Sequence, residues 1–214
     1  MSFLIKSLSF LIADVHYENA QHLFNKWVSE KGINNKDEYK LALDEINFAL
    51  QNNKYNAHYY DTKARILDWG IAGNFEIEAN YNNVVKLFLK STELRPYWPV
   101  TWIELAAVNE IVQGMSSDTR TYIQKALVNG YYNRHVINGI LSILLLSWDN
   151  LTFADKMLFF KLLKVTSQKE QLLSKALMDA KALDKHTLVC SQIKYDKDYK
   201  DYKNKWPFTG VCAF

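Results

Sequence analysis

Apolar side chains recur at three- and four-residue spacing along most of this chain, which is the pattern of helices that bury one face. Short polar breaks separate these segments, for example at residues 51–56, at residues 72–74 and at Gly114. Glycine and asparagine at such breaks end helices. The pattern therefore predicts an all-α fold in which consecutive helices pack as antiparallel pairs.

Small and large residues recur at a fixed interval within this pattern. Each of three small residues is followed, eleven positions later, by a large anchor, in the pairs Ala49 and Tyr60, Ser91 and Trp102, and Ala126 and Ile137. The small positions are 42 and 35 residues apart, against the 34-residue period of tetratricopeptide repeats. Residues 75–82 account for the longer step, either as an insertion or as a longer helix start. We therefore expect a tetratricopeptide-like stack, an α-solenoid, with Trp102 buried and with Pro96 and Trp98 as structural residues at the junction.

The two ends of the chain depart from the repeat pattern, which suggests three parts: residues 1–15, 16–193 and 194–214. Residues 3–15 are mainly apolar but interrupted by Lys6, and a spanning helix needs about 20 residues. They are either a partial membrane anchor or a first helix lying on the core. Residues 170–183 should form a C-terminal capping helix. Residues 194–205 are rich in Lys, Asp and Tyr and are expected to be solvated and mobile, with an apolar ending after them.

Composition and motifs argue against several classes of function. The chain has 26 Lys and Arg against 23 Asp and Glu, a net charge of +3, and it lacks the basic stripe of a nucleic-acid-binding protein. No nucleophile elbow, phosphate-binding loop, dinucleotide fingerprint or zinc-binding His pair is present. The five histidines are dispersed and no Cys spacing suits a metal. We expect a non-enzymatic protein without cofactor or metal.

The concave face of such a stack, lined by the first helix of each pair, is the expected binding surface. The residues expected there are His58, Asp61, Arg65, Asp68, Trp69, Glu110, His135 and Asn138. Mixed charge with an aromatic side chain could hold a peptide or a sugar chain, or the face could simply be solvated. The Lys and Asn clamp by which some tetratricopeptide proteins bind an acidic C-terminus is absent.

Three segments resemble the VpsP family of polysaccharide-biosynthesis proteins: residues 11–27, residues 94–106 and residues 188–190. The Arg-Pro-x-Trp-Pro-x-x-Trp sequence at residues 95–102 is the most specific part. The resemblance implies a bacterial helix-repeat protein attached to the inner membrane by its N-terminus and facing the periplasm. It also implies partners among the proteins of exopolysaccharide or capsule assembly and export, or polysaccharide itself. A general protein adaptor and a glycan-binding protein are the alternative functions.

Cys190 and Cys212 are the two cysteines of the chain. They are either two unrelated thiols or a disulfide that ties the apolar C-terminal end to the helices. The compartment that the resemblance implies is oxidising, and thiols form disulfides there.

Overall fold

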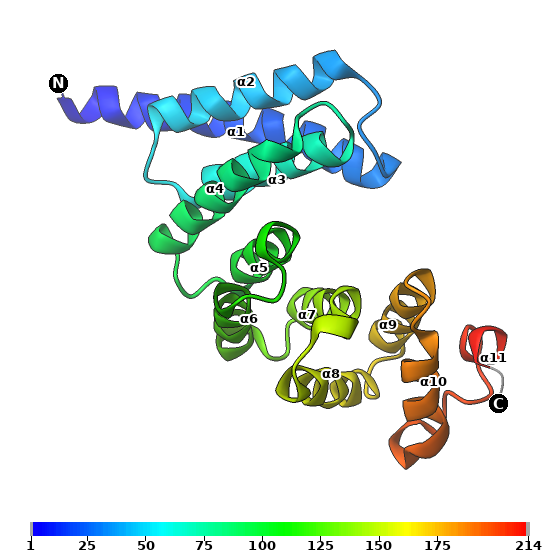
Figure 1. Ribbon diagram of the computed structural model, residues 1–214. Helices are drawn as coiled ribbons and strands as arrows, with labels where there is room; N and C mark the ends of the chain where they lie inside the picture. The colour runs from blue at the N-terminus through cyan, green and yellow to red at the C-terminus, as the bar shows by residue number, and fades with distance from the viewer. Residues whose placement is uncertain (1, 213–214) are drawn as a thin grey trace. The chain divides into compact units, whose positions relative to one another are not determined.

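The computed structural model describes residues 2–212, with side chains described from residue 7 onward. Within those residues the chain is 79% helical, with eleven α-helices and no strand. The all-α fold that the apolar periodicity predicted is confirmed (Figure 1). The chain forms two compact units, Met1–Val108 and Asn109–Phe214. The division falls within the third expected repeat, so each unit is described by itself.

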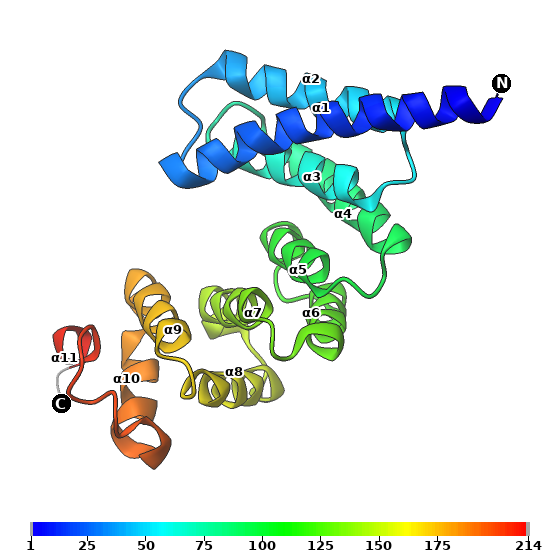
Figure 2. The same ribbon diagram turned by 180° about the vertical axis from the view of Figure 1, so that it is seen from behind.

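The first unit is built from helix pairs. Helix α1 (Ser2–Glu30) packs along α2 (Lys36–Asn52), and α3 (Ala57–Ala72) packs along α4 (Tyr81–Leu94), as Figures 1 and 2 both show. A 3-10 turn, η1 (Glu78–Asn80), precedes α4 within the expected insertion. The first residues of α5 (Pro99–Gln113) complete the unit.

Local chemistry explains where these helices begin. The side chains of Asn35 and Asn56 cap α2 and α3 by accepting hydrogen bonds from the backbone N–H groups of Asp37 and His58. An N-cap of this kind satisfies one of the unpaired donors at a helix start. Pro99 is the first residue of α5, a position where its missing N–H costs nothing.

The core of the first unit combines aromatic residues with small residues that let helices approach closely. Trp27, Tyr39 and Tyr59 are buried, and Ala42 and Ala49 are fully buried. One close approach requires glycine: a Cβ added at Gly70 of α3 would lie 2.5 Å from ring carbons of Tyr39 on α2. The two pairs therefore meet through a contact that a larger residue at this position would disrupt.

The repeat register can be compared with the buried positions. Ala49, Ser91 and Ala126 are all fully buried, and Trp102 is 6% exposed. The Trp102 indole N–H donates to the Pro96 carbonyl at 2.7 Å, and the Tyr60 hydroxyl donates to the Lys54 carbonyl at 3.1 Å. Both bonds reach six residues back. Tyr60 is nonetheless half-buried, because its neighbour Tyr59 takes the core position.

The second unit holds the remaining helices. They are α6 (Ser117–Gly130), α7 (Arg134–Leu146), α8 (Phe153–Thr166), α9 (Glu170–Ala182), α10 (His186–Tyr195) and α11 (Phe208–Val211), with 3-10 turns η2 (Trp148–Asn150) and η3 (Lys197–Tyr199). Helix α7 packs on α8 and α9, and α10 and α11 pack on α9. The expected capping helix, α9, is therefore itself covered.

The two ends of the chain differ from the expected division. Helix α1 runs without interruption through the expected boundary after residue 15. Within the described residues, no helix combines the length and apolar character that crossing a membrane requires. The prediction of a partial membrane anchor also concerns the side chains of residues 1–6, which lie outside the described residues.

Most side chains of residues 194–205 are exposed, as expected of a solvated segment, but parts of the segment contact the helices. Tyr199 is fully buried, and the Tyr202 hydroxyl donates to the Ser167 carbonyl at 2.7 Å. Lys205 forms an ion pair with Glu170 at 2.9 Å. Tyr199 and Tyr202 therefore contact the helices within a largely exposed segment, whereas Tyr195 is exposed.

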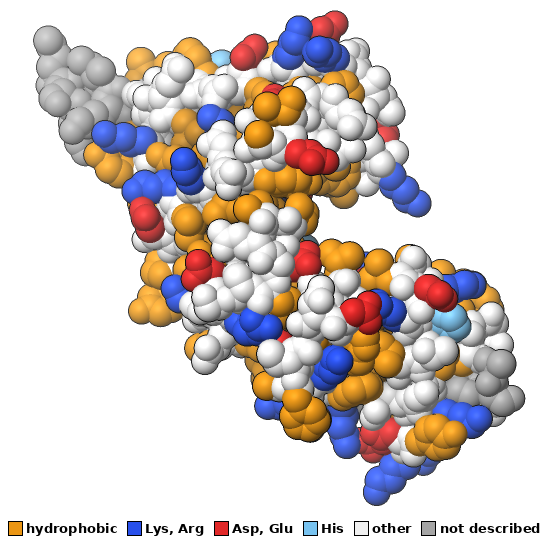
Figure 3. Space-filling model, in the orientation of Figure 1, with side chains coloured by type: hydrophobic (Ala, Val, Ile, Leu, Met, Phe, Trp, Pro, Cys, Tyr) orange, Lys and Arg blue, Asp and Glu red, His pale blue; other side chains and the backbone are white. Residues whose placement is uncertain are grey.

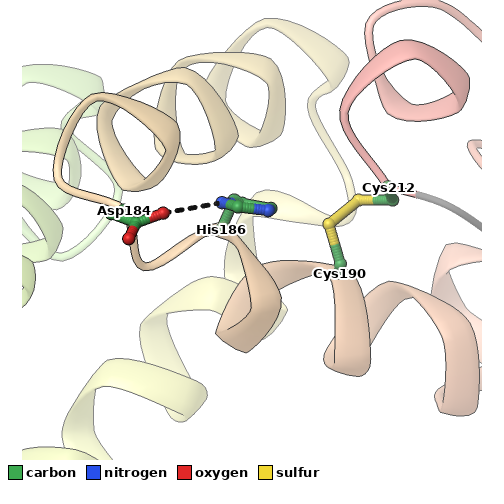
Figure 4. The surroundings of a disulfide bond; sticks show 4 residues. All are labelled: Asp184, His186, Cys190 and Cys212. Atoms are coloured by element: carbon green, nitrogen blue, oxygen red, sulfur yellow. Dashed lines mark ion pairs between the residues drawn. A yellow bond between two sulfur atoms is a disulfide. The ribbon is translucent and has the colours of Figure 1, made fainter.

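The C-terminal end docks, as the apolar ending predicted. Phe208 of α11 is fully buried. Cys212 is joined to Cys190 of α10 in a disulfide with a Cα–Cα distance of 5.4 Å, and Figure 4 shows this bond linking the two helices. Of the two alternatives for the cysteines, the structure has the disulfide.

Candidate functional site

Four of the expected site residues, His58, Asp61, Arg65 and Asp68, follow one another at three- or four-residue spacing along α3. We call this surface the α3 face. It adjoins side chains from the end of α4 and the start of α5, which complete its network of contacts.

Asp61 is the central residue of this face. It is 6% exposed, and its carboxylate accepts a 2.7 Å hydrogen bond from the Thr101 hydroxyl of α5. It also forms an ion pair with Arg65, one turn further along α3, at 3.3 Å. A buried carboxylate needs such partners because an unpaired charge away from water is costly. The contacts fix the orientation of Asp61 and Arg65 together.

Arg65 lies between two carboxylates. Its guanidinium lies 4.0 Å from Glu104 of α5 as well as near Asp61. The Nε of Arg65 faces Asp61 without the geometry of a hydrogen bond, so this buried N–H lacks a hydrogen-bond acceptor within the described residues. The Nε of Arg95 is also buried and also lacks a hydrogen-bond acceptor within the described residues. The face therefore holds two cationic groups whose hydrogen-bonding capacity is incompletely used.

Arg95, at the end of α4, joins His58 and Trp98 at the rim of the face. Its guanidinium lies 4.4 Å from the centre of the Trp98 ring, and its Nη1 lies 2.7 Å from Nε2 of His58. Partial burial, followed by the charge of Arg95, lowers the pKa of His58. The ring is therefore neutral at pH 7, and a neutral imidazole nitrogen can accept the Arg95 hydrogen bond.

Trp98, expected to be a structural residue of the junction, lies outside the core. It is 45% exposed, and its ring meets that of His58 edge to face at 6.3 Å between centroids. Pro96 is also exposed. Residues four apart share a face only when both lie in the same helix. Trp98 precedes Pro99, the first residue of α5, so its spacing from the buried Trp102 does not place the two side chains on one face.

Asp68 and Trp69, near the C-terminal end of α3, differ from one another in their surroundings. Trp69 packs edge to face against Phe24 of α1 at 5.6 Å between centroids and borders the core. Burial, and then the charge of Glu104, raise the pKa of Asp68 to about 6. Asp68 makes no hydrogen bond or ion pair in the part of the chain that the structure describes.

A pocket of about 450 Å³ lies beside the rim of the face. Its lining includes Phe10 of α1, Tyr55 in the turn before α3, His58 and Arg95, together with Asn53 and Asn56. Phe10 and Tyr55 are exposed. Exposed aromatic rings beside amide side chains offer both a flat apolar surface and hydrogen-bonding groups.

The other expected site residues belong to the second unit. Glu110 accepts a hydrogen bond from the Ser147 hydroxyl at the end of α7. His135 is exposed at the start of α7, and Asn138 is half-buried, with no partner for its Oδ1 among the described residues. Within the described residues, Glu110 and Asn138 share no hydrogen bond or ion pair, in contrast to the residues of the α3 face.

Arg95 and Thr101 are the site residues that sequence reasoning missed. Both lie in the Arg-Pro-x-Trp-Pro-x-x-Trp segment, which carried a signal of its own through the family resemblance. Helical periodicity could not predict that they belong to the site, because Arg95 lies just after α4 and Thr101 lies in the first turn of α5.

Charge and metal-binding groups give no sign of another site. On the face that Figure 3 presents, acidic and basic side chains are interspersed in each unit. Within residues 2–212, no three His, Cys, Asp or Glu side chains gather in a way that could hold a metal ion.

No protein-family model and no curated protein matches this chain. Fold and site together define an all-α protein of helix pairs with a polar, partly buried network on the α3 face.

Proposed function

We propose that this protein is a non-enzymatic helical-repeat adaptor of bacterial exopolysaccharide or capsule assembly, and that its α3 face holds a segment of a partner protein. The observation that carries the proposal is the network of Asp61, Arg65, Arg95 and Thr101. Contacts among these side chains fix their positions before a partner arrives, which lowers the entropy cost of binding.

The chemistry of the α3 face suits a peptide segment. Carboxylates accept hydrogen bonds from backbone or side-chain N–H groups, and arginine N–H groups donate to carbonyls and carboxylates. The face carries both kinds of group, with the partly exposed Arg65 guanidinium beside the carboxylates of Asp61 and Glu104. The role in polysaccharide assembly is supported by the sequence resemblance at residues 11–27 and 94–106.

We further propose that the protein works at the inner membrane, facing the periplasm. The Cys190–Cys212 disulfide supports an oxidising compartment. Leu8, Leu11 and Val15 are exposed on α1 at spacings of three and four residues. An apolar stripe of this kind on a helix supports attachment at a membrane surface.

Deleting the gene and measuring the yield and chain length of secreted polysaccharide tests the proposal. Complementation with the wild-type chain should restore both, and Arg65→Ala should not. The matched control is Arg134→Ala, which removes an exposed arginine of the second unit and should complement. Circular dichroism confirms that both variants fold. Unchanged polysaccharide in the deletion strain would contradict the proposal.

Glycan binding is a second candidate, which the aromatic rim favours. Trp98, Tyr55 and Phe10 are exposed around or beside the 450 Å³ pocket, and sugars stack on such rings while amides bind their hydroxyls. Titration with the polysaccharide of the producing cell should change tryptophan fluorescence in the wild type and not in Trp98→Ala. An unchanged wild-type spectrum would dismiss this candidate.

A further inference from the structure

A second pocket of the first unit, which we call the Asp68 pocket, lies between the α1–α2 turn and the C-terminal end of α3. Its volume is about 290 Å³, and its lining comprises residues 31–33 of the turn with Asp68, Trp69, Ala72 and Gly73. A water molecule takes about 30 Å³ in the liquid. The pocket therefore has room for a group of several heavy atoms.

Asp68 supplies the carboxylate of this pocket. No basic side chain among the described residues forms an ion pair with it. Asp61 has Arg65 as its ion-pair partner, whereas Asp68 has no hydrogen bond or ion pair within residues 2–212. Its neighbour Glu104 has the same charge and lowers the acidity of Asp68 further. A half-buried carboxylate without an ion-pair partner is stabilised in its ionised form by a cation placed close to it.

The rest of the pocket suits the same ligand. Trp69 presents an aromatic surface, and a cation near an indole ring is attracted by its electron density. Ile33 and Ala72 supply apolar wall, along which an aliphatic stem can lie. The C-terminal end of a helix carries partial negative charge, which also attracts cations.

We propose that the Asp68 pocket binds a basic side chain, the ammonium or guanidinium group of a lysine or arginine in the partner segment. The cationic head contacts the Asp68 carboxylate and the Trp69 ring, and the aliphatic stem lies on Ile33 and Ala72. This inference deepens the proposed function and rests on it for the identity of the partner. It assigns one specificity position of that partner.

The charged groups around the pocket include one that can compete with the ligand for Asp68. Lys31 lines the pocket and is exposed, with no ion pair among the described residues. Tyr81 lies near enough for the charge of Asp68 to raise the pKa of its hydroxyl. A Lys31 ammonium that turned toward Asp68 would occupy the place of the ligand, so the test includes its removal.

The test uses the full chain and two small probes, N-acetyl-lysine methylamide and N-acetyl-norleucine methylamide. The probes share an aliphatic stem, and only the lysine probe carries a charge. Two-dimensional amide NMR should show that the lysine probe shifts the signals of residues 31–33 and 68–73. The norleucine probe should leave them in place. A carbon-detected pH titration should show the Asp68 midpoint moving down when the lysine probe is bound.

Three variants sharpen the result. Asp68→Asn should weaken binding of the lysine probe at least tenfold, whereas Asp44→Asn, at an exposed position of α2, should not change it. Lys31→Ala should retain or strengthen binding. Equal shifts with both probes, no shift at residues 31–33 and 68–73, or undiminished binding by Asp68→Asn would overturn the inference. These outcomes do not depend on polysaccharide yield, so the inference and the proposed function can fail separately.

Discussion

The Thr101 hydroxyl donates a 2.7 Å hydrogen bond to the Asp61 carboxylate, and both side chains are buried. This bond connects α3 to the start of α5 across 40 residues of sequence. The same hydroxyl lies 3.4 Å from Nη2 of Arg95. One small polar side chain therefore links the acid and the base of the α3 face.

Removing this hydroxyl should destabilise the first unit. Thr101→Val keeps the shape of the side chain but leaves the buried Asp61 without its hydroxyl donor, which costs about 1–3 kcal/mol. Urea unfolding followed by circular dichroism measures the loss. The matched control is Thr121→Val on α6, where the hydroxyl is exposed and bonds within its own helix. Equal stability of the two variants would show that the Asp61–Thr101 bond is unimportant.

Two tryptophans four residues apart should respond differently to truncation. Trp102 is 6% exposed, and Trp102→Ala removes a buried indole and its bond to Pro96, at a cost of about 3–5 kcal/mol. Trp98→Ala removes an exposed ring and should cost about 1 kcal/mol or less. Thermal and urea unfolding of both variants checks the contrast. A cost below about 1 kcal/mol for Trp102→Ala would contradict the proposed repeat register.

The same two residues show how far the sequence could predict the fold. Apolar spacing located the helices, and the eleven-residue interval identified Ala49, Ser91 and Ala126 as buried positions, because small residues are required where paired helices touch. The spacing could not separate Trp98 from Trp102. Only the start of α5 at Pro99 decides that Trp98 precedes the helix.

The site was harder to predict than the fold for a related reason. The residues of the α3 face share one helix, so helical spacing was sufficient to group them. Arg95 and Thr101 join them from α4 and α5, and their contact depends on how those helices pack. In the tail, composition indicated a solvated segment, and most of its side chains are exposed, but composition could not show that Tyr199 is buried.

The raised pKa of Asp68, about 6 in the folded protein, predicts a pH-dependent stability. A carboxyl whose folded pKa exceeds its unfolded pKa binds its proton more tightly when folded, so its contribution to stability falls as pH rises from about 4 to about 6. The total change is on the order of 2–3 kcal/mol. Asp68→Asn should therefore gain stability over the wild type as pH rises through this window.

Urea unfolding of the wild type and Asp68→Asn at pH 4, 5, 6 and 7 measures this effect. The stability difference between them should grow between pH 4 and pH 6 and then level off. Asp44→Asn, exposed on α2, should follow the wild type at every pH. A constant difference between Asp68→Asn and the wild type across the series would show that the Asp68 pKa is normal.

The Cys190–Cys212 disulfide should stabilise the docked C-terminal end of the second unit. The bond spans a sequence separation of 22 residues, for which loop entropy predicts about 3 kcal/mol. Its loss should free α11, whose Phe208 is fully buried. Amide hydrogen exchange at residues 196–212 should therefore quicken in a Cys190→Ser, Cys212→Ser double variant, while exchange in α1 to α4 stays unchanged.

The oxidation state of these cysteines also tests the proposed compartment. Protein isolated from the producing cell without reductant should contain no thiol that iodoacetamide can alkylate after unfolding, because both sulfur atoms are in the disulfide. Treatment with dithiothreitol before alkylation should add two labels, which mass spectrometry counts. The double serine variant is the control and should take up none. Two labels on untreated native protein would show reduced cysteines in the cell and would remove the support that the disulfide gives to a periplasmic location.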